Sequence, residues 1–592
     1  MSARRLWLAL VLILFCLPLF AGLRSLDLET DEAIYSFAVD RMLDDGEWLR
    51  PKSSPSDDVV FLEKPPLKFW IVAAPIRAGL LPRDELGFRF WDAAFGSLAF
   101  LYVFAIGCRL AGPVCGGVAV FLLFVHAPLV LDHGLRTNNM ESALVLCYCG
   151  GVYHYLAWAG DTGRRARHAV ATGVYFVLGF LTKFVAALFL PFTLALAALA
   201  FGSSRAKLAS EWRPWAAVAG LVLALIVPWF AFAQSQFGGL LWETMLAEHV
   251  YARFTTALNP AHVQPWYYYV ARMWSAFEVA RVQWLVLAGL VVLGIQTVRR
   301  RSHDGAVVCM WATIPLALMS LGSSKLYHYA YPFVPPVALA AGYIVGLTAL
   351  LGPPVVRKAL ERVDDGIGRY LPQLRALATK GWVRAVAAVL TWAAVATVFW
   401  SETWGQARVS LGRTVLFRSS GVLRPMVAIL AAAIVTRRSQ TASVVLVAIV
   451  VGSALPFAAY RDTLPRLTAA RHPLRDAADC VRRVQDGLPA DARTGLYVDT
   501  DSSMWHPINY YFRRVHPWTH QYAPDAEKFL GYVSDPAQFR PILVQEARYR
   551  LYTSGEQATR ISPPLIPLSE YVLLLPGPYR VCSPEARLHS PS

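Results

Sequence analysis

The chain has 592 residues, of which 56% are hydrophobic and 16% charged, and its mean hydropathy is +0.41. Because a soluble enzyme carries about 25% charged residues, this composition excludes an ordinary soluble protein and indicates a polytopic membrane protein. The net charge of +16 is typical either of nucleic-acid binding or of basic loops at a membrane surface.

The first apolar run extends from Leu6 to Leu23. Since no small-residue cleavage site follows it, we interpret the run as an uncleaved span rather than a signal peptide. Together with it, apolar windows of about 20 residues predict about 13 transmembrane helices. The other predicted spans are 88–110, 114–131, 139–159, 167–182, 183–202, 213–233, 280–298, 306–322, 328–351, 382–400, 421–436 and 441–459.

The loop charges indicate the orientation of these spans. If the N-terminus is cytoplasmic, the dense basic clusters fall on the inside, among them Arg164-Arg165, Arg299-Arg300-Arg301 and Arg437-Arg438. This placement follows the positive-inside rule, so the basic excess is mainly a topology signal and we expect no nucleic-acid partner. The basic inside segment 352–381 is either a surface helix on anionic headgroups or a plain linker.

An odd number of spans places the C-terminal region on the outer face. Residues 461–592 lose the long apolar runs, and we expect a small soluble α/β domain there. Helical periodicity predicts a helix between Pro473 and Gly487, and short apolar runs predict strands at 495–499 and 571–575. Cys480 and Cys582 are the only cysteines of this region, and they are either paired or free.

The long outer loop 24–87 opens on a predicted interfacial helix. Thr30 stands where an N-cap would, Asp31 and Glu32 follow in the first turn, and Gly46 ends the helix. The two carboxylates either cap a solvent-exposed helix or are residues of an active site.

Further candidate residues lie on the same outer face. Glu63-Lys64-Pro65-Pro66 joins a carboxylate that can take a divalent cation to a lysine that suits a phosphate, although a surface ion pair explains the two side chains as well. Arg136 and Glu141 flank the start of the fourth span, where they bind a headgroup or cap the helix. His249 and Arg253 lie in the outer loop 234–279, and His249 becomes a plausible metal ligand when paired with Glu63.

These motifs resemble, in their order along the chain, a family of membrane glycosyltransferases. Asp31-Glu32, then Phe61-Leu62-Glu63-Lys64-Pro65-Pro66-Leu67, then Leu178-Gly179-Phe180-Leu181-Thr182-Lys183, and then Ser323-Ser324-Lys325-Leu326 with Tyr331-Pro332 are similar to those of GT-C fold enzymes. The nearest group is the superfamily of lipid A aminoarabinose transferases and protein O-mannosyltransferases. The resemblance implies a transmembrane catalytic domain at 1–460 and a periplasmic domain at 461–592, in a bacterial inner membrane.

The resemblance also implies roles for the candidate residues. It implies a reaction in which a sugar leaves a polyprenyl-phosphate carrier for a lipid, glycan or protein acceptor, among membrane lipids. We expect the catalytic residues to be Asp31 and Glu32, the donor-phosphate ligands to be Lys64, Arg136, Lys183 and Lys325, the acceptor or headgroup ligands to be Glu141 and Arg253, and the ligands of a divalent cation (Zn, Mg or Mn) to be Glu63 and His249.

Two other classes of protein share many of these features. A ligase or polymerase of surface polysaccharide also uses polyprenyl-linked sugars at the outer face. A transporter of lipid-linked sugars also has many spans, but it would place ionisable residues at mid-span and often shows internal repeats, whereas the candidate charges here gather at one face.

Overall fold

A computed structural model provides the fold. It describes residues 3–54, 58–160, 165–256, 260–370, 380–404, 407–411, 414–419, 456–489, 495–500, 505–513, 518–534, 540–554, 565–568 and 571–575, with positions 373, 425, 427, 428 and 515. The chain divides into two compact units. The first is formed by residues 1–21, 62–68 and 90–467, and the second by residues 22–61, 69–89 and 468–592.

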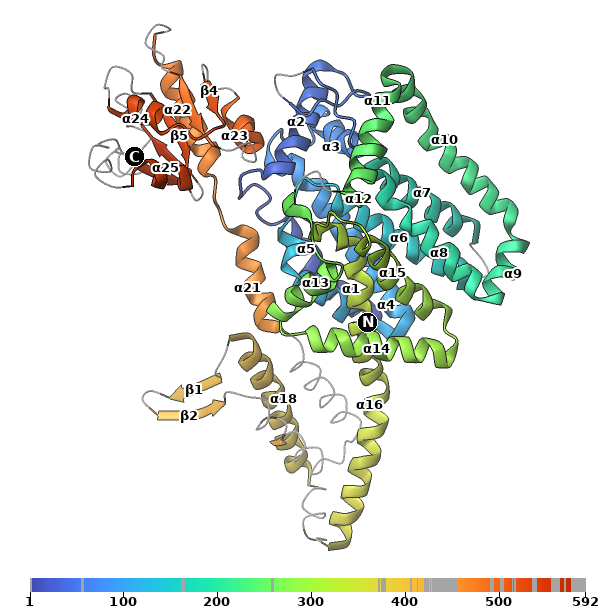
Figure 1. The fold of residues 1–592 in the computed structure, drawn as a ribbon. Helices are drawn as coiled ribbons and strands as arrows, with labels where there is room; N and C mark the ends of the chain where they lie inside the picture. The colour runs from blue at the N-terminus through green and yellow to red at the C-terminus, as the bar shows by residue number, and fades with distance from the viewer. Residues whose placement is uncertain are drawn as a thin grey trace. The chain divides into compact units, whose positions relative to one another are not determined.

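The described residues of the first unit are mostly helical (Figure 1). Helices α6 and α7 lie side by side, and α10 packs on α7. In chain order its elements are α1 (Ala3–Val11), η1 (Leu12–Cys16), η2 (Leu17–Phe20), α4 (Glu85–Phe124, which starts in the second unit), α5 (Ala127–Leu131), α6 (Glu141–Gly160), α7 (Arg165–Lys183), η3 (Phe184–Ala187), α8 (Phe189–Ala200), α9 (Gly202–Ser210), α10 (Trp212–Phe237), α11 (Gly239–Trp242), η4 (Glu243–Ala252), α12 (Arg253–Thr255), η5 (Pro260–His262), α13 (Tyr268–Val279), α14 (Gln283–Arg300), α15 (His303–Ser320), η6 (Tyr327–Phe333), α16 (Val334–Tyr370), α18 (Gly381–Trp404), β1 (Ala407–Leu411), β2 (Thr414–Ser419) and α21 (Phe457–Thr468).

Each apolar segment predicted between Leu6 and residue 400 coincides with helix in this list. Within the described residues, five helices are long and apolar enough to cross a membrane, or six if the bent pair α8–α9 counts as one span. The chain is therefore a helical membrane protein, and the larger number of about 13 spans stays a prediction. The predicted spans at 421–436 and 441–459 lie almost entirely outside the described residues.

Small residues bring two of the apolar helices into close contact. In α4 the chain reverses at Ala111 and Gly112, whose φ of 85° is in the left-handed region that glycine favours. Beyond this break, α4 packs on Gly342 and Gly346 of α16, which are spaced by four residues. A Cβ atom at Gly342 would lie 2.4 Å from the carbonyl oxygen of Cys115, so only glycine fits there.

The basic segment that follows this glycine pair is helical as far as the structure describes it. Helix α16 continues without interruption to Tyr370, so the first half of segment 352–381 extends the apolar helix and is not a separate surface helix. This continuation was not predicted, because the apolar run ends near Leu351 whereas α16 continues to Tyr370.

The second unit combines two helices of the first loop with the C-terminal region. Its helices are α2 (Thr30–Asp45), α3 (Leu67–Arg77, which starts in the first unit), α22 (Pro473–Asp486), α23 (Trp505–Phe512), α24 (Ala526–Ser534) and α25 (Glu546–Tyr552). Five strands form one sheet in the order β4-β3-β5-β7-β6, from β3 (Leu496–Asp499), β4 (Trp518–Gln521), β5 (Ile542–Gln545), β6 (Leu565–Leu568) and β7 (Tyr571–Leu574). Strands β4, β3 and β5 are parallel, and β7 is antiparallel to both β5 and β6.

The helix and the two strands expected from the C-terminal sequence coincide with α22, β3 and β7. Buried residues of all three pack in one core, among them Val481, Val498 and Leu573. Cys480 is disulfide-bonded, whereas its candidate partner Cys582 lies outside the described residues.

The start of α2 depends on a buried arginine of α4. The N-cap is Glu29 rather than the expected Thr30, and Gly46 ends the helix with a φ of 72°, as predicted. Glu32 is fully buried and accepts from Arg89 Nε at 2.7 Å and from Arg89 Nη2 at 2.6 Å. The same guanidinium donates to the backbone carbonyls of Leu23, Leu26 and Asp27 at 2.8–3.1 Å. All five guanidinium N–H groups are thus used, which fixes both the helix and the chain before it.

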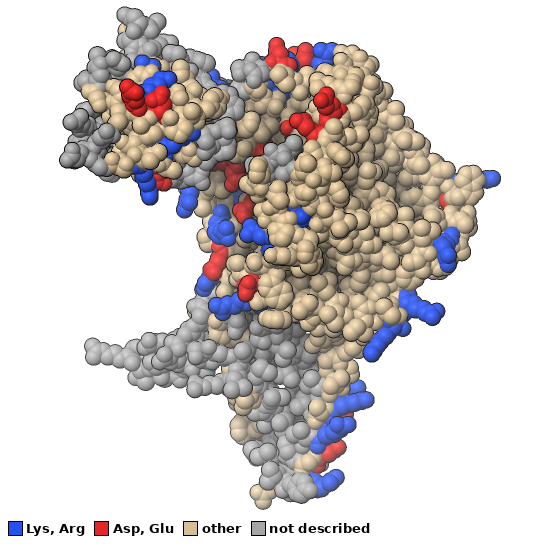
Figure 2. Space-filling model, in the orientation of Figure 1, with Lys and Arg blue, Asp and Glu red and all other residues tan. Residues whose placement is uncertain are grey.

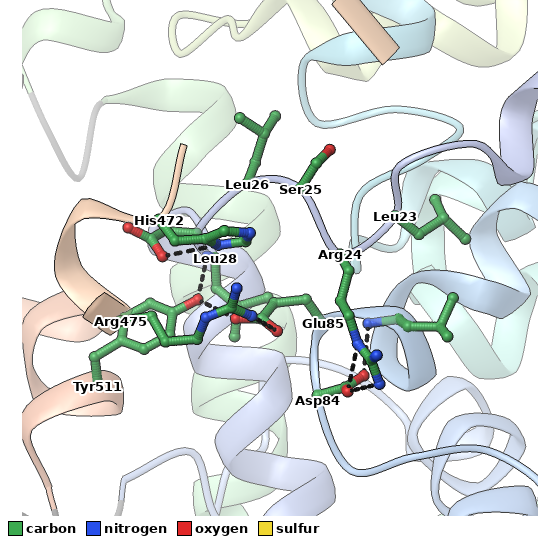
Figure 3. Close-up of polar contacts among 12 residues, drawn as sticks. Leu23, Arg24, Ser25, Leu26, Leu28, Asp84, Glu85, His472, Arg475 and Tyr511 are labelled. Carbon is green, nitrogen blue, oxygen red and sulfur yellow. Dashed lines mark hydrogen bonds and ion pairs between the residues drawn. The ribbon is translucent and has the colours of Figure 1, made fainter. Parts of the chain in front are cut away.

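A second polar network joins this chain segment to α22 and α23 (Figure 3). Glu85 accepts from Tyr511 Oη at 2.9 Å and from Arg475 Nη1 at 2.9 Å. Asp27 accepts from the backbone N–H of Leu474 at 2.8 Å, and its other oxygen lies 3.5 Å from Nδ1 of His472. Burial raises the pKa of Asp27 to about 7, against the lowering effect of the Leu474 and Arg475 N–H groups.

Arg89→Lys should destabilise the protein by about 3–5 kcal/mol, because a lysine cannot reach three carbonyls and one carboxylate and leaves buried acceptors unpaired. The measurement is the thermal midpoint of the purified chain. Arg41→Lys is the matched control, since Arg41 pairs with Asp45 and Asp58 at a partly exposed site where such pairs contribute about 0–1 kcal/mol. Equal midpoints for the two variants would contradict this account of Arg89.

The raised pKa of Asp27 predicts a pH-dependent stability. Between about pH 4 and pH 7 the folded state holds a proton on Asp27 that the unfolded state releases. This stabilisation is complete below about pH 4 and is lost as the pH rises through 7. Asp27→Asn keeps an acceptor for Leu474 but does not titrate, so its thermal midpoint should fall less than that of the wild type between pH 5 and pH 8. A wild-type midpoint that rises over this interval relative to the variant would overturn the assignment.

Candidate functional site

The first part of the site is the turn before α3. Pro65 and Pro66 cannot continue a helix, so Glu63 and Lys64 lie in a bend just before α3. Glu63 Oε2 lies 3.7 Å from Lys64 Nζ and 3.6 Å from Nε2 of His249, which is in η4. Burial lowers the pKa of Lys64, and the neighbouring Lys183 and Arg253 act in the same direction, whereas Glu63 opposes them.

Glu63 and His249 fit the first two ligands of a divalent metal ion. Tetrahedral zinc with bonds of 2.0–2.1 Å separates its ligand atoms by about 3.4 Å, close to the 3.6 Å observed between this carboxylate and imidazole. Burial lowers the pKa of His249 to about 4, so the imidazole is neutral at physiological pH and its nitrogen can bind a metal.

The second part of the site surrounds Glu141, the buried first residue of α6. Lys183, the last residue of α7, donates to Glu141 Oε1. His133 and His328 also lie beside this carboxylate, each with a ring nitrogen 3.7 Å from a Glu141 oxygen. Their rings are stacked, with centroids 4.3 Å apart and planes inclined by 9°. His133 has a φ of 55°, a conformation that is rare outside glycine and common at functional sites.

Tyr329 connects the two parts. Its hydroxyl accepts from Arg253, and the Lys183 ammonium lies 5.1 Å from its ring centroid. Lys64, Lys183 and Arg253 therefore form one group of three basic side chains beside two carboxylates, Glu63 and Glu141. This excess of positive charge, partly shielded from water, is suited to a phosphate group.

Three groups of residues in the described part of the chain bear on metal binding. His133, Glu141 and His328 bring their ligand atoms within 4.8 Å of one another, but the lone pairs of nearly parallel rings do not converge and Lys183 already neutralises the carboxylate. Asp27, Glu85 and His472 are equally close, but Arg475 and Tyr511 engage Glu85. The pair Glu63 and His249 remains the better candidate.

Four of the residues expected in the site have mainly structural contacts or lie elsewhere. Arg136 donates to the carbonyl oxygens of Leu19, Ala21 and Leu467, and Lys325 donates to those of Gln264 and Gly322. Asp31 and Glu32 belong to α2 in the second unit, where Asp31 is half-buried in the first turn and Glu32 pairs with Arg89.

Sequence reasoning missed His133, His328 and Tyr329 around Glu141. It also missed Lys68, which is 1% exposed and whose ammonium lies 2.9 Å from both oxygens of the buried Asp92. A signal was available for His328 and Tyr329, which stand between the expected Lys325 and Tyr331. A signal was also available for Lys68, because it is a charged residue inside the apolar run that follows Pro66.

Residues 63–232 match the family described as dolichyl-phosphate-mannose-protein mannosyltransferase. An undecaprenyl phosphate-alpha-4-amino-4-deoxy-L-arabinose arabinosyl transferase of Sodalis glossinidius is 25% identical over 401 residues, which is 66% of this chain and 67% of the relative. The corresponding transferase of Pseudomonas savastanoi is 27% identical over 56% of this chain and 59% of its own length. These alignments therefore leave a third or more of each relative unmatched.

Among solved structures, ArnT from Cupriavidus metallidurans bound to undecaprenyl phosphate superposes with a TM-score of 0.57 at 18% identity, over 97% of this chain and 98% of that one. This likeness shows the fold. The family match and these relatives make the chain similar to the undecaprenyl-phosphate aminoarabinose transferases and to the dolichyl-phosphate-mannose-protein mannosyltransferase family.

Proposed function

We propose that this chain transfers a sugar from a polyprenyl-phosphate carrier to an acceptor at the outer, periplasmic face of a bacterial inner membrane. The observation that carries the proposal is the convergence of Lys64, Lys183 and Arg253 on one partly buried site at the ends of apolar helices. A carrier lipid enters such a site from the bilayer, and the three cations take its phosphate.

The chemistry required of these cations follows from the reaction. The bond between the anomeric carbon of the sugar and the phosphate oxygen breaks, and a bond from that carbon to an acceptor oxygen forms. Negative charge develops on the departing carrier phosphate, so cations that bind it more tightly as it leaves lower the barrier. Glu141 holds Lys183 in place, and His133 and His328 hold Glu141, so these four residues act together on the phosphate site.

Asp31 is our candidate for the general base. When the acceptor is a hydroxyl, its proton passes to the Asp31 carboxylate as the new bond forms. We assign Glu32 to positioning, because its carboxylate is already bound by Arg89.

We further propose a cytoplasmic N-terminus and an acceptor of the lipid A, glycan or protein class.

Glu63 and His249 are the proposed ligands of a divalent cation, and zinc suits a nitrogen and oxygen donor pair best. When bound, the cation supplies further positive charge beside the phosphate.

The first experiment separates the roles of Asp31 and Lys64. Asp31→Asn should lower turnover by about 10²–10⁴-fold and leave donor affinity nearly unchanged, since loss of one charge in the first turn of α2 costs the helix only about 0.3–1 kcal/mol. Lys64→Ala should weaken donor binding by about 10–100-fold, because a charge-assisted contact to phosphate is lost. The measurements are turnover and donor affinity with a labelled polyprenyl-phosphate sugar, and the released carrier should be the monophosphate.

Lys52→Ala is the matched control, since Lys52 is a lysine of the same outer loop that pairs with Asp45 and Asp58. Near wild-type turnover for Asp31→Asn at equal thermal stability would limit Asp31 to a favourable charge in the first turn of α2. Release of the carrier diphosphate would replace the transferase by a ligase.

The second experiment concerns the metal. His249→Ala should lower both the zinc content of the purified protein and its affinity in a calorimetric zinc titration, because one of two protein ligands is lost. His262→Ala, in the same outer loop, should behave like the wild type. Unchanged zinc content in His249→Ala would remove this residue from the site.

A further inference from the structure

A buried ion pair that the proposed reaction does not use joins α3 to α4. Lys68, the second residue of α3, and Asp92 of α4 are 1% and 0% exposed. The Lys68 ammonium lies 2.9 Å from both oxygens of the carboxylate. Uncharged residues cover most of the face of the first unit that Figure 2 shows, so a pair of charges in the interior of this unit calls for an explanation.

The Lys68–Asp92 pair also binds the chain on both sides of Glu141. The ammonium donates to the backbone carbonyl of Asn139 at 2.9 Å and to the side-chain oxygen of Asn138 at 3.3 Å. Ser142, the residue after Glu141, donates its hydroxyl proton to the carboxylate of the pair. The start of α6 is therefore attached to the pair through three separate hydrogen bonds.

Helix α4 touches the segment before α6 directly, one turn after the pair. Gly96 follows Asp92 by four residues and so lies on the same face of α4. A Cβ atom at Gly96 would lie 2.9 Å from Cβ of Leu135, which leaves no room for a side chain between α4 and this segment. The pair thus acts across a direct contact, and a shift of either partner is transmitted to Glu141.

The pair is close along the chain to the first part of the site as well. Lys68 follows Lys64 by four residues, and Pro65 and Pro66 restrict the backbone between them. Four residues span at most about 14 Å, so the bend with Glu63 and Lys64 cannot move far from the buried ammonium. Both parts of the site are therefore tied to one ion pair.

An ion pair imposes a narrower geometry on its neighbours than an apolar contact does. Apolar packing is non-directional, whereas an ammonium has three N–H groups that each need an acceptor in place. Stability alone does not explain the pair, because replacing a buried ion pair by apolar side chains is often neutral or stabilising. A requirement for a fixed distance between the two parts of the site does explain it.

We propose that Lys68 and Asp92 are positioning residues of the donor site. They fix the distance between Lys64 on one side and the Glu141–Lys183 pair on the other. The inference rests on the proposed function, in which Lys64 and Lys183 bind one carrier phosphate. Charge on this phosphate grows as the sugar leaves, so a displacement of about 1 Å weakens the contact in the transition state more than in the bound donor.

The test is the double variant Lys68→Met with Asp92→Asn. It removes both charges together, so no unpaired charge is left buried, and the new amide still accepts from Ser142. For the full-length chain with a labelled polyprenyl-phosphate sugar, kcat should fall by about 10–100-fold while KM changes by less than about threefold. The thermal midpoint should stay close to that of the wild type. A milder variant, Ser142→Ala, loses one hydrogen bond to Asp92 and should lower kcat about two- to tenfold.

Combination with Lys64→Ala separates positioning from a purely structural role. If the pair positions Lys64, its loss matters less once Lys64 is absent. The combined loss in kcat/KM should then be at least about threefold smaller than the product of the two separate losses. The matched control is Arg109→Met with Asp304→Asn, because this ion pair, at 3.0 Å, joins α4 to α15. Its kcat should be near that of the wild type, and its effect should simply multiply with that of Lys64→Ala.

Two results would overturn the proposal: an unchanged kcat in the folded double variant, and losses that multiply when it is combined with Lys64→Ala. If the double variant does not fold, an unchanged kcat in Ser142→Ala overturns it. A wild-type chain that neither binds nor transfers the labelled sugar would refute the proposed function, and this inference with it. An active wild type beside an equally active double variant would refute the positioning role alone.

Discussion

The contact between Arg89 and Glu32 is the interaction on which the outer loop depends. A guanidinium with every N–H group engaged, next to a carboxylate that is fully buried, tolerates almost no displacement. It fixes the first turn of α2 and the three carbonyls of the chain that leads into it. Asp31, one residue before Glu32, is therefore held on a rigid turn although it lies on a loop between membrane helices. A catalytic carboxylate needs such a support, because an error of about 1 Å in its position is costly.

The chain segment that leads into α2 is also hydrogen-bonded to the C-terminal region. Ser25 and Asp27 exchange backbone hydrogen bonds with Arg471, and Asp27 caps the start of α22 through Leu474. Glu85, four residues before Arg89, receives Arg475 and Tyr511. Residues more than 380 positions apart in sequence thus share one polar core within the second unit. The C-terminal region therefore contacts the segment that leads into α2 and the candidate base.

Sequence patterns predicted the helices and strands of this protein better than the contacts between its side chains. Apolar runs found the helices up to residue 400, and Gly46, α22, β3 and β7 followed from glycine preference and periodicity. Glu63, Lys64, Glu141 and Lys183 were predicted as outer charges in an ordered motif, and the structure brings them close together. The role of Glu32 was not predictable, because its partner Arg89 lies 57 residues away in an apolar helix. His133 and His328 are separated by almost 200 residues, so no local pattern joins them. Arg136 and Lys325 donate to backbone carbonyls, which a cation beside a membrane helix can bind as readily as a phosphate, so their expected phosphate contacts stay predictions.

The glycine contact between α4 and α16 has a consequence for how the protein is made. The face of α4 around Cys115 is synthesised more than 220 residues before Gly342, its partner in α16. At 5–20 residues per second, this face waits on the order of 10–45 s in the bilayer before the matching surface emerges from the ribosome. During that interval lipid tails or other helices with small residues can occupy it. Assembly of this enzyme therefore depends on exchange of such temporary neighbours, and the helices made between α4 and α16 have to leave this face accessible.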